Sequence, residues 1–406
     1  MLFCEALSDR IKQNLWRVDA VKKIKIVKFL CAVLAASMLS GCSIIQNLMP
    51  TEPQTQVPMD FTGIVDFVLH AEADREFRIL QFTDIQLRDE ATDRIPGRSK
   101  DTTLLTNEEL YAESFYYIEE AVQRAQPDLI LVTGDNVYGQ FDDSGRLFKS
   151  LVDFMETLET PWAPVFGNHD NESAMGVTWQ CQQFEEAEHC LFKRGNITGN
   201  SNYTIGIEQG GKLIKVIYMM DSNGCGSAYS VSQLPDFTYN EGENIKTTIG
   251  LADDQLQWLN LTSSRITGAL HYTPSKFLAM HINPDEFVDA ALSKGYMTDD
   301  RTDNFVIEDP TGVDFGMKYE PLGAYFEMPG LWDMLKKHRF DGIFCGHQHT
   351  NNVSMLCDGI RLTYGLKTGT MDYHRTDMQG GTLITVAEGG ESFRVQHIYI
   401  QVPENK

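Results

Sequence analysis

Hydrophobic and polar positions alternate regularly from Phe77 to the end of the chain, and their pattern predicts an α/β domain. Short apolar runs typical of buried strands alternate with longer segments whose apolar residues recur every three to four positions, as in amphipathic helices. Strands are expected at 77–82, 129–132, 163–166, 213–220, 276–280, 342–345, 360–364, 381–387 and 393–401. Helices are expected at 107–126, 147–158, 253–266 and 331–338.

The order of these elements predicts how the domain is built. Strand–helix alternation followed by strands near the end favours a mixed sheet or two sheets, within one domain spanning 75–403. Two stretches, 171–200 and 284–322, have weak periodicity and are interpreted as insertions. The second is rich in Asp, Glu, Tyr and Phe, so we expect it to form a lid or a substrate wall.

The region before residue 42 has the pattern of an export signal. Lysines at 22–28 precede a short apolar run at 29–38, and residues 39–42 read Leu-Ser-Gly-Cys. This tetrapeptide resembles the lipobox of bacterial lipoproteins, which implies that Cys42 is lipidated and anchors an exported protein to the cell membrane. The alternative is a plain signal peptide that is cut nearby. Residues 1–20 do not fit a signal, and we interpret them as an artefact of the gene model.

The segment that follows the signal is expected to be a tether. Residues 42–74 begin with Pro50, Pro53 and Pro58 among Gln and Thr residues, a composition typical of flexible linkers. The sequence therefore predicts a signal region at 1–41, an anchor and tether at 42–74, and the catalytic domain after them.

Composition excludes several classes of protein. The 406 residues are 42% hydrophobic and 22% charged, which is ordinary for a globular protein and argues against wholesale disorder. The net charge of −23 argues against a nucleic-acid partner. No apolar run in the body approaches the roughly 18 residues that a membrane span needs. Cys181 and Cys190 could form a local disulfide in an oxidising compartment, or both could stay free.

Candidate chemistry comes from five polar clusters that each follow a predicted strand. They lie at 82–86, 134–136, 167–170, 280–284 and 346–349. Because ligands bind at the carboxyl ends of strands in open α/β sheets, these clusters are expected to meet at one site. Their Asp, Asn and His residues suit a pair of Mn, Fe or Zn ions better than Ca or a lone Mg. Two such ions can promote displacement at phosphorus.

Together these motifs resemble the calcineurin-like metallophosphoesterase superfamily. Segments 281–287, 346–352 and 359–365 resemble the late segments of its purple-acid-phosphatase-like branch. The resemblance implies a two-sheet β-sandwich flanked by helices and two metal ions. It implies that one ion is bound by Asp84, Asp135 and His349. It implies that the second ion is bound by Asp135, Asn168, His281 and His347.

The resemblance also implies roles for two residues that are not ligands. His169 would face the phosphate and donate a hydrogen bond or a proton, which suits an imidazole because it titrates near neutral pH. Asp170 would orient His169 through the other ring nitrogen.

One position departs from the common motif of the superfamily. Gln86 stands where most members have a His, and a neutral amide oxygen is a weaker donor that favours Mn over Zn. Purple acid phosphatases fill this place with a Tyr three residues after the bridging Asp, and Tyr138 has that spacing. Either residue could complete the first metal site, and we prefer Gln86. A purple iron centre would favour Tyr138.

The expected function is hydrolysis of a phosphate-ester substrate outside the cytoplasmic membrane, with monoesters favoured over diesters. A phosphodiesterase or a nucleotide-diphosphate hydrolase of the same superfamily is one alternative. A non-catalytic surface lipoprotein that keeps the metal site is the other. The expected function and the first alternative share their chemistry, and only a substrate test separates them.

Overall fold

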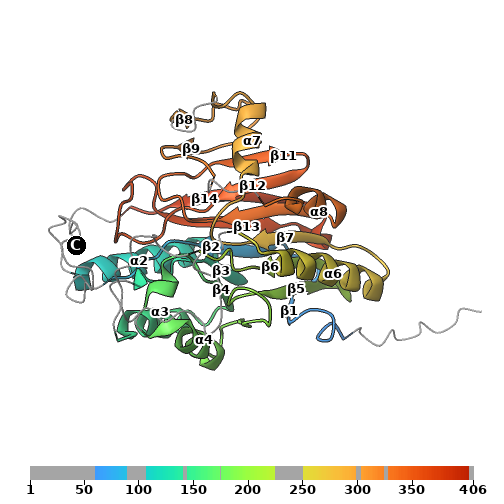
Figure 1. Ribbon diagram of the computed structural model, residues 1–406, viewed down its shortest axis with the longest axis horizontal. Coiled ribbons are helices and arrows are strands. Elements are labelled where there is room, and N and C mark those ends of the chain that lie inside the picture. Colours follow the sequence, from blue (N-terminus) through green and yellow to red (C-terminus); the bar gives the residue numbers. More distant parts are fainter. Residues whose placement is uncertain are drawn as a thin grey trace, which may run out of the picture. The chain divides into compact units, whose positions relative to one another are not determined.

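Two β-sheets form the centre of the structure, which is a computed structural model (Figure 1). It describes residues 60–88, 107–139, 144–173, 175–224, 250–298, 303–323 and 328–401. The signal region, Cys42 and the first part of the tether lie outside the described residues, so the predictions made for them stay predictions. Among the helices of the described ranges, none is long and apolar enough to cross a membrane.

The larger sheet has seven strands in the order β1-β5-β6-β7-β10-β12-β11. Strands β6, β7, β10 and β12 run parallel to one another, and β11 closes one edge in the antiparallel direction. In chain order the strands are β1 (Phe67–His70), β5 (Tyr203–Gln209), β6 (Lys212–Met219), β7 (Ser275–Ala279), β10 (Phe340–Cys345), β11 (Ser354–Cys357) and β12 (Ile360–Tyr364).

The smaller sheet has five strands in the order β14-β13-β2-β3-β4. Strands β2, β3 and β4 run parallel to one another, and β13 pairs in the antiparallel direction with both β2 and β14. Their bounds are β2 (Phe77–Phe82), β3 (Leu129–Thr133), β4 (Trp162–Val165), β13 (Gly380–Val386) and β14 (Phe393–Tyr399). A separate two-stranded ribbon pairs β8 (Phe305–Val306) with β9 (Met317–Lys318).

Two hydrophobic cores hold these layers together. One core joins residues of both sheets, such as Phe82, Phe277 and Phe344, to apolar residues of helices that follow β2, β3 and β4. The other core packs further helices against the larger sheet. The helices are α2 (Asn107–Ala125), α3 (Arg146–Glu156), α4 (Gly176–Glu186), α6 (Asp253–Leu270), α7 (Glu286–Ser293) and α8 (Leu331–Lys337). The predicted fold class, a two-sheet sandwich flanked by helices, is confirmed.

The structure extends the predicted domain towards the N-terminus. Strand β1 pairs with β5 through Phe67 and Ile205, and one compact unit begins at Asp60 rather than at residue 75. Segments 171–200 and 284–322 are also more regular than expected, since they contain α4 and α7. Phe287 of α7 is fully buried, so part of the second segment belongs to the core. Cys181 and Cys190 are free thiols.

Candidate metal centre

The predicted ligands lie just beyond the ends of five strands. Asp84 follows β2, Asp135 follows β3 and Asn168 follows β4, all in the smaller sheet. His281 follows β7 and His347 follows β10, both in the larger sheet. Because each of these strands has a parallel neighbour, their carboxyl ends deliver the polar residues to a common edge.

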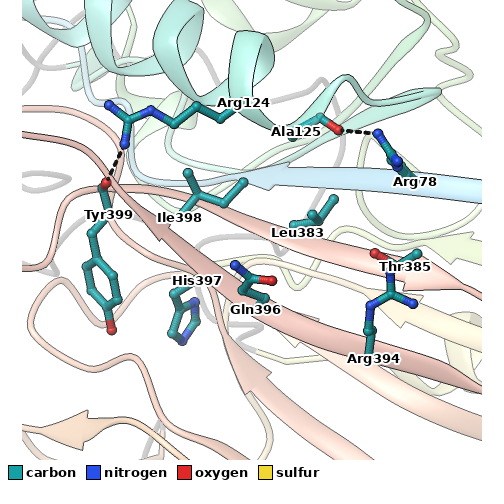
Figure 2. A pocket seen from close by; sticks show the side chains of 10 residues that line it. All are labelled: Arg78, Arg124, Ala125, Leu383, Thr385, Arg394, Gln396, His397, Ile398 and Tyr399. Carbon is teal, nitrogen blue, oxygen red and sulfur yellow. Dashed lines mark hydrogen bonds between the residues drawn. The ribbon is translucent and has the colours of Figure 1, made fainter.

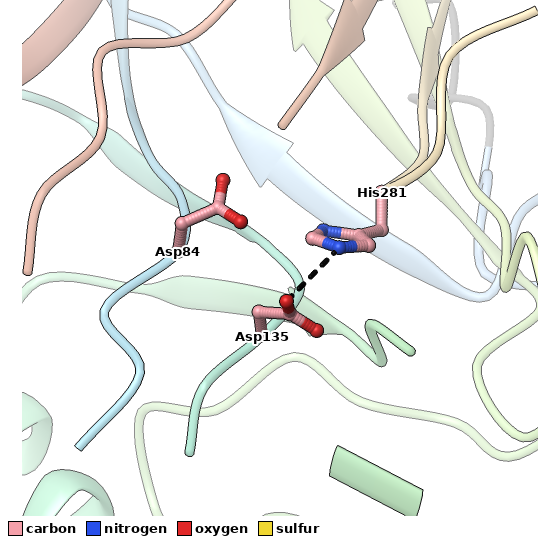
Figure 3. A group of neighbouring side chains, drawn as sticks. All are labelled: Asp84, Asp135 and His281. Atoms are coloured by element: carbon pink, nitrogen blue, oxygen red, sulfur yellow. Dashed lines mark ion pairs between the residues drawn. The ribbon is translucent and has the colours of Figure 1, made fainter. Parts of the chain in front are cut away.

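The structure brings the predicted ligands into contact. Figure 3 shows that Asp84, Asp135 and His281 point toward one another, and their ligand atoms lie within 4.8 Å of one another. The Nε2 atom of His281 lies 3.3 Å from Asp135 Oδ2 and 3.0 Å from Asn168 Oδ1. On the other side, His349 Nε2 lies 3.3 Å from Asp84 Oδ1. The ring of His347 lies 5.2 Å from that of His281, measured between centroids.

Backbone carbonyl groups orient two of the histidine rings. Nδ1 of His281 lies 2.8 Å from the carbonyl oxygen of Thr133, and Nδ1 of His349 lies 3.0 Å from that of Tyr373. Because a carbonyl oxygen only accepts, each Nδ1 atom carries the hydrogen and donates it. A neutral ring then presents the lone pair of Nε2 to the site, which is the arrangement found in metal-binding histidines.

The site is consequently an assembly of acceptors. The Nε2 lone pair of His281 faces the oxygens of Asp135 and Asn168, and none of these three atoms carries a hydrogen when the ring is neutral. Buried Asp84 Oδ1 accepts no hydrogen bond among the described residues. Acceptors packed at such distances repel one another unless a proton or a metal ion lies between them. The donor set therefore fits divalent metal ions.

The charges at the site lead to the same conclusion. Burial opposes the charged form of His281, yet the Asp135 carboxylate outweighs burial and raises the pKa of His281 to about 9. Burial also opposes ionisation of Asp84, but its contacts with His349 and His281 lower its pKa to about 2. Burial and then the His281 charge lower the pKa of His347 to about 3. The two carboxylates thus demand a positive charge, which a bound metal would supply.

Several residues of the site have a strained backbone conformation that directs their side chains into the site. Asp84, Gln86, Asp135 and His347 have φ values of 51°, 48°, 52° and 73°, in the left-handed region that costs a non-glycine residue about 1–3 kcal/mol. Close packing adds to the constraint, since a Cβ atom placed on Gly167 would lie 2.1 Å from Asp135 Oδ1. Such strain persists only where surrounding contacts fix the residue, as they do here.

His169 lies beside the ligands, but its partner differs from the predicted one. Its Nδ1 atom donates to Glu172 Oε2 at 2.8 Å, and Glu172 is fully buried. Burial opposes the charged ring, but Glu172 and Asp135 raise the pKa of His169 to about 9. The ring also stacks on Tyr138, with centroids 4.0 Å apart. His169 is therefore held as a charged donor.

The role predicted for Asp170 is corrected by these contacts. Its carboxylate accepts hydrogen bonds from the backbone N–H groups of Gly167 at 2.7 Å and Val137 at 3.0 Å, so it ties the strand-end loops together. Asp170 begins the short 3₁₀ helix η3 (Asp170–Glu172), whereas Glu172 lies three residues after His169 on the same side of the turn. That spacing was visible in the sequence and could have identified Glu172.

The contacts of Gln86 differ from those expected of a metal ligand. The amide oxygen of Gln86 accepts a hydrogen bond from Lys367 Nζ at 2.7 Å, and its amide nitrogen donates to Asp135 Oδ2 at 3.0 Å. Its oxygen is thus turned to a lysine and not to the other ligands. Lys367 was not singled out in the sequence, because it lies 281 positions from Gln86.

A hollow of about 510 Å³ lies elsewhere, between α2 and strands β13 and β14. Figure 2 shows Arg78, Arg124 and Arg394 on its walls. Arg394 is paired with Glu76 at 2.8 Å, Arg124 with Glu120 at 3.2 Å, and Arg78 donates to a backbone carbonyl. Its guanidinium groups thus already have acceptors, and none of the predicted ligands lines the hollow, so the metal centre is the stronger candidate site.

Comparison with known proteins gives a consistent picture. The model of the calcineurin-like phosphoesterase family matches residues 77–351. A protein of Arabidopsis thaliana named "Probable inactive purple acid phosphatase 29" is 24% identical over 318 residues, which cover 74% of this chain and 72% of that protein. Another from the same plant, "Probable inactive purple acid phosphatase 28", is 36% identical over 273 residues, covering 64% of this chain and 62% of that protein.

Solved structures with related folds are more distant. A dimetal phosphatase from Danio rerio is 12% identical with a TM-score of 0.44, and the match covers 80% of this chain and 99% of that one. The purple acid phosphatase PPD1 of yellow lupin is 11% identical with a TM-score of 0.37, covering 78% of this chain and 50% of that one.

Proposed function

The chain belongs to the calcineurin-like phosphoesterase family, and from this premise we propose that it hydrolyses phosphate esters at a centre of two metal ions. The observation that carries the proposal is the convergence of buried carboxylate, amide and imidazole ligand atoms from both sheets. The residues that the family motifs imply as ligands support the proposal, apart from position 86. The residues would be Asp84, Asp135, Asn168, His281, His347 and His349.

The arrangement suggests which residues would bind each of the two ions. Asp84 and His349 are neighbours on one side, while Asn168 and His281 are neighbours on the other. Asp135 has two carboxylate oxygens and could contact both ions. When bound, the ions would activate water and offset the charge of the phosphate oxygens.

His169 supports the reaction from outside the ligand set. Glu172 fixes the hydrogen on Nδ1, so a protonated ring would also present Nε2–H as a donor. The Glu172 carboxylate favours the charged ring, which can donate a hydrogen bond to a phosphate oxygen or a proton to the leaving group. Glu172 is then a positioning residue for His169.

Finer features of the function belong to the same proposal. The preference for monoesters rests on resemblance to the purple-acid-phosphatase-like branch, and the mixed carboxylate, amide and imidazole ligands suit Mn, Fe or Zn ions. Export and membrane anchoring rest on residues 39–42, with Cys42 as the lipidated residue.

A second candidate function is binding without catalysis. It is favoured by the names of the Arabidopsis relatives, which include the word "inactive". Against it, this chain keeps the ligands named above and keeps His169 beside them with a buried carboxylate partner. Because these groups are kept, we favour the enzyme.

Hydrolysis assays with the full chain test this choice. The protein is loaded with Mn²⁺, and a chromogenic phosphomonoester is compared with the matching diester, with and without chelator. We expect turnover that the chelator abolishes and that Asp135→Asn lowers by at least about 1,000-fold. Two bound metal ions with no turnover of either ester would reject the enzyme in favour of a binding protein.

A further inference from the structure

A buried lysine contacts the metal centre at the position where the chain departs from the family motif. Lys367 follows β12, and only 1% of its surface is exposed. Its Nζ atom donates to the backbone oxygen of Asp84 at 2.9 Å and to Gln86 Oε1 at 2.7 Å. Gln86 is fully buried, so both partners are removed from solvent.

This lysine decides which way the Gln86 amide points. An ammonium group offers only donors, so the amide atom that faces it must be the oxygen. The amide nitrogen then faces Asp135 Oδ2 at 3.0 Å, where a donor meets a carboxylate. The flipped amide would place N–H groups against the ammonium and an oxygen against the carboxylate, so both contacts would become unfavourable.

The backbone around Lys367 is fixed against the loop that carries Asp84 and Gln86. The N–H of Thr368 donates to the oxygen of Thr83 at 2.9 Å, and the N–H of Gly369 donates to that of Asp84 at 3.2 Å. A Cβ atom on Gly369 would lie 1.8 Å from the oxygen of Ile85. The lysine is thus held in place by its own segment and cannot easily withdraw.

We propose that Lys367 holds the Gln86 amide oxygen away from the first metal, so that Gln86 donates to Asp135 instead and neither residue is a metal ligand. The first metal then lacks the amide ligand expected from Gln86 while Asp84, Asp135 and His349 remain, so it is bound more weakly than the second. A lysine charge next to that position weakens it further. This inference rests on the proposed function, because it assumes a two-metal centre.

Equilibrium dialysis of the full chain against Mn²⁺ tests the inference without measuring catalysis. The unchanged protein should bind two ions with different affinities. Gln86→Leu should still bind two ions, because no ligand is lost. Lys367→Met should tighten the weaker site by at least about tenfold, since it removes a nearby positive charge and frees the amide oxygen.

Lys276→Met is a matched control for the loss of a buried lysine. Lys276 is fully buried at the start of β7, and its Nζ atom donates to the backbone oxygens of Pro274 and His338. Its removal should lower stability but leave both Mn²⁺ affinities unchanged. Equal tightening in Lys276→Met and Lys367→Met would overturn the inference, because the effect would not be local.

The remaining outcomes separate this inference from the proposed function. If the unchanged protein binds two ions and Gln86→Leu binds one, Gln86 is a ligand and the inference is wrong, while the proposed function stands. An unchanged weaker site in Lys367→Met overturns the role of the lysine. If Lys367→Met does not fold, Gln86→Leu alone decides. Fewer than two ions bound to the unchanged protein would contradict the proposed function itself.

Discussion

At the metal centre, the second partner of each imidazole ring decides what that ring can do. His281 and His349 donate Nδ1–H to backbone carbonyls and are left with a lone pair for a metal. His169 donates to the carboxylate of Glu172 instead, which stabilises a positive charge on the ring. The sequence predicted these histidines as site residues, but not the carbonyl partners of His281 and His349, which lie 148 and 24 positions away.

Glu172→Gln is expected to shift the pH dependence of the reaction. The amide keeps a hydrogen-bond acceptor but loses the charge that raises the pKa of His169 to about 9. His169 acts in its protonated form. As the pH is raised, activity should therefore begin to decline at a lower pH in the variant than in the unchanged protein, and turnover near pH 8 should drop about 10–100-fold. A pH–rate profile measures this, and bound Mn²⁺ should be unchanged. An unshifted profile would show that Glu172 only supports the loop.

Gly167→Ala is expected to disturb Asp135 through direct contact. The added methyl group would lie 2.1 Å from Asp135 Oδ1, so the carboxylate must move. We expect Mn²⁺ affinity to fall at least about tenfold and stability to fall by about 1–3 kcal/mol. Gly268→Ala in α6 is the control, because nothing lies within 4 Å of the added atom. Equal Mn²⁺ affinity in both variants would contradict the packing argument.

At the scale of elements, the sequence predicted those strands best whose buried apolar residues form one continuous run. Strands β2 and β12 were predicted to the residue, and β3 is buried along its whole length. Strand β1 was missed because it is half-buried and depends on β5, which lies far along the chain. Helices α4 and α7 were missed because their apolar residues recur too irregularly to stand out in the sequence.

Strand β1 is expected to stabilise the domain although it lies at a sheet edge. Phe67 packs edge-on against Tyr203 with centroids 5.8 Å apart, and Asp66 accepts a hydrogen bond from the backbone N–H of Thr204 at 2.9 Å. A chain that begins at residue 75 should therefore be about 2–4 kcal/mol less stable than one that begins at residue 60. Urea unfolding compares the two chains. Equal unfolding midpoints would support the domain boundary at residue 75 that was predicted from the sequence.

At the scale of the whole molecule, the metal centre joins the two sheets. Asp84, Asp135 and Asn168 come from the smaller sheet, while His281 and the histidines after β10 come from the larger one. The motifs allowed this convergence to be predicted, because strand ends share an edge. The contact between Lys367 and Gln86 could not be predicted, since it depends on how two distant loops pack.

Metal ions should therefore stabilise the folded chain as a whole. Ligands that bind only the folded state add about 2.7 kcal/mol at 100 times the dissociation constant, so Mn²⁺ should raise the melting temperature by roughly 2–4 °C. A chelator should remove the increase, and Asp135→Asn should lack it. Calorimetry measures the shift. If Mn²⁺ leaves the melting temperature unchanged, the ligands do not bridge the two sheets through a metal.

Anomalous diffraction from crystals of the Mn²⁺-loaded protein tests the two-metal centre most directly. We predict two peaks, one contacted by Asp84 and His349 and the other by Asn168, His281 and His347, with Asp135 contacting both. The side chain of Gln86 should contact neither peak. A single peak, or two peaks away from these residues, would contradict the account.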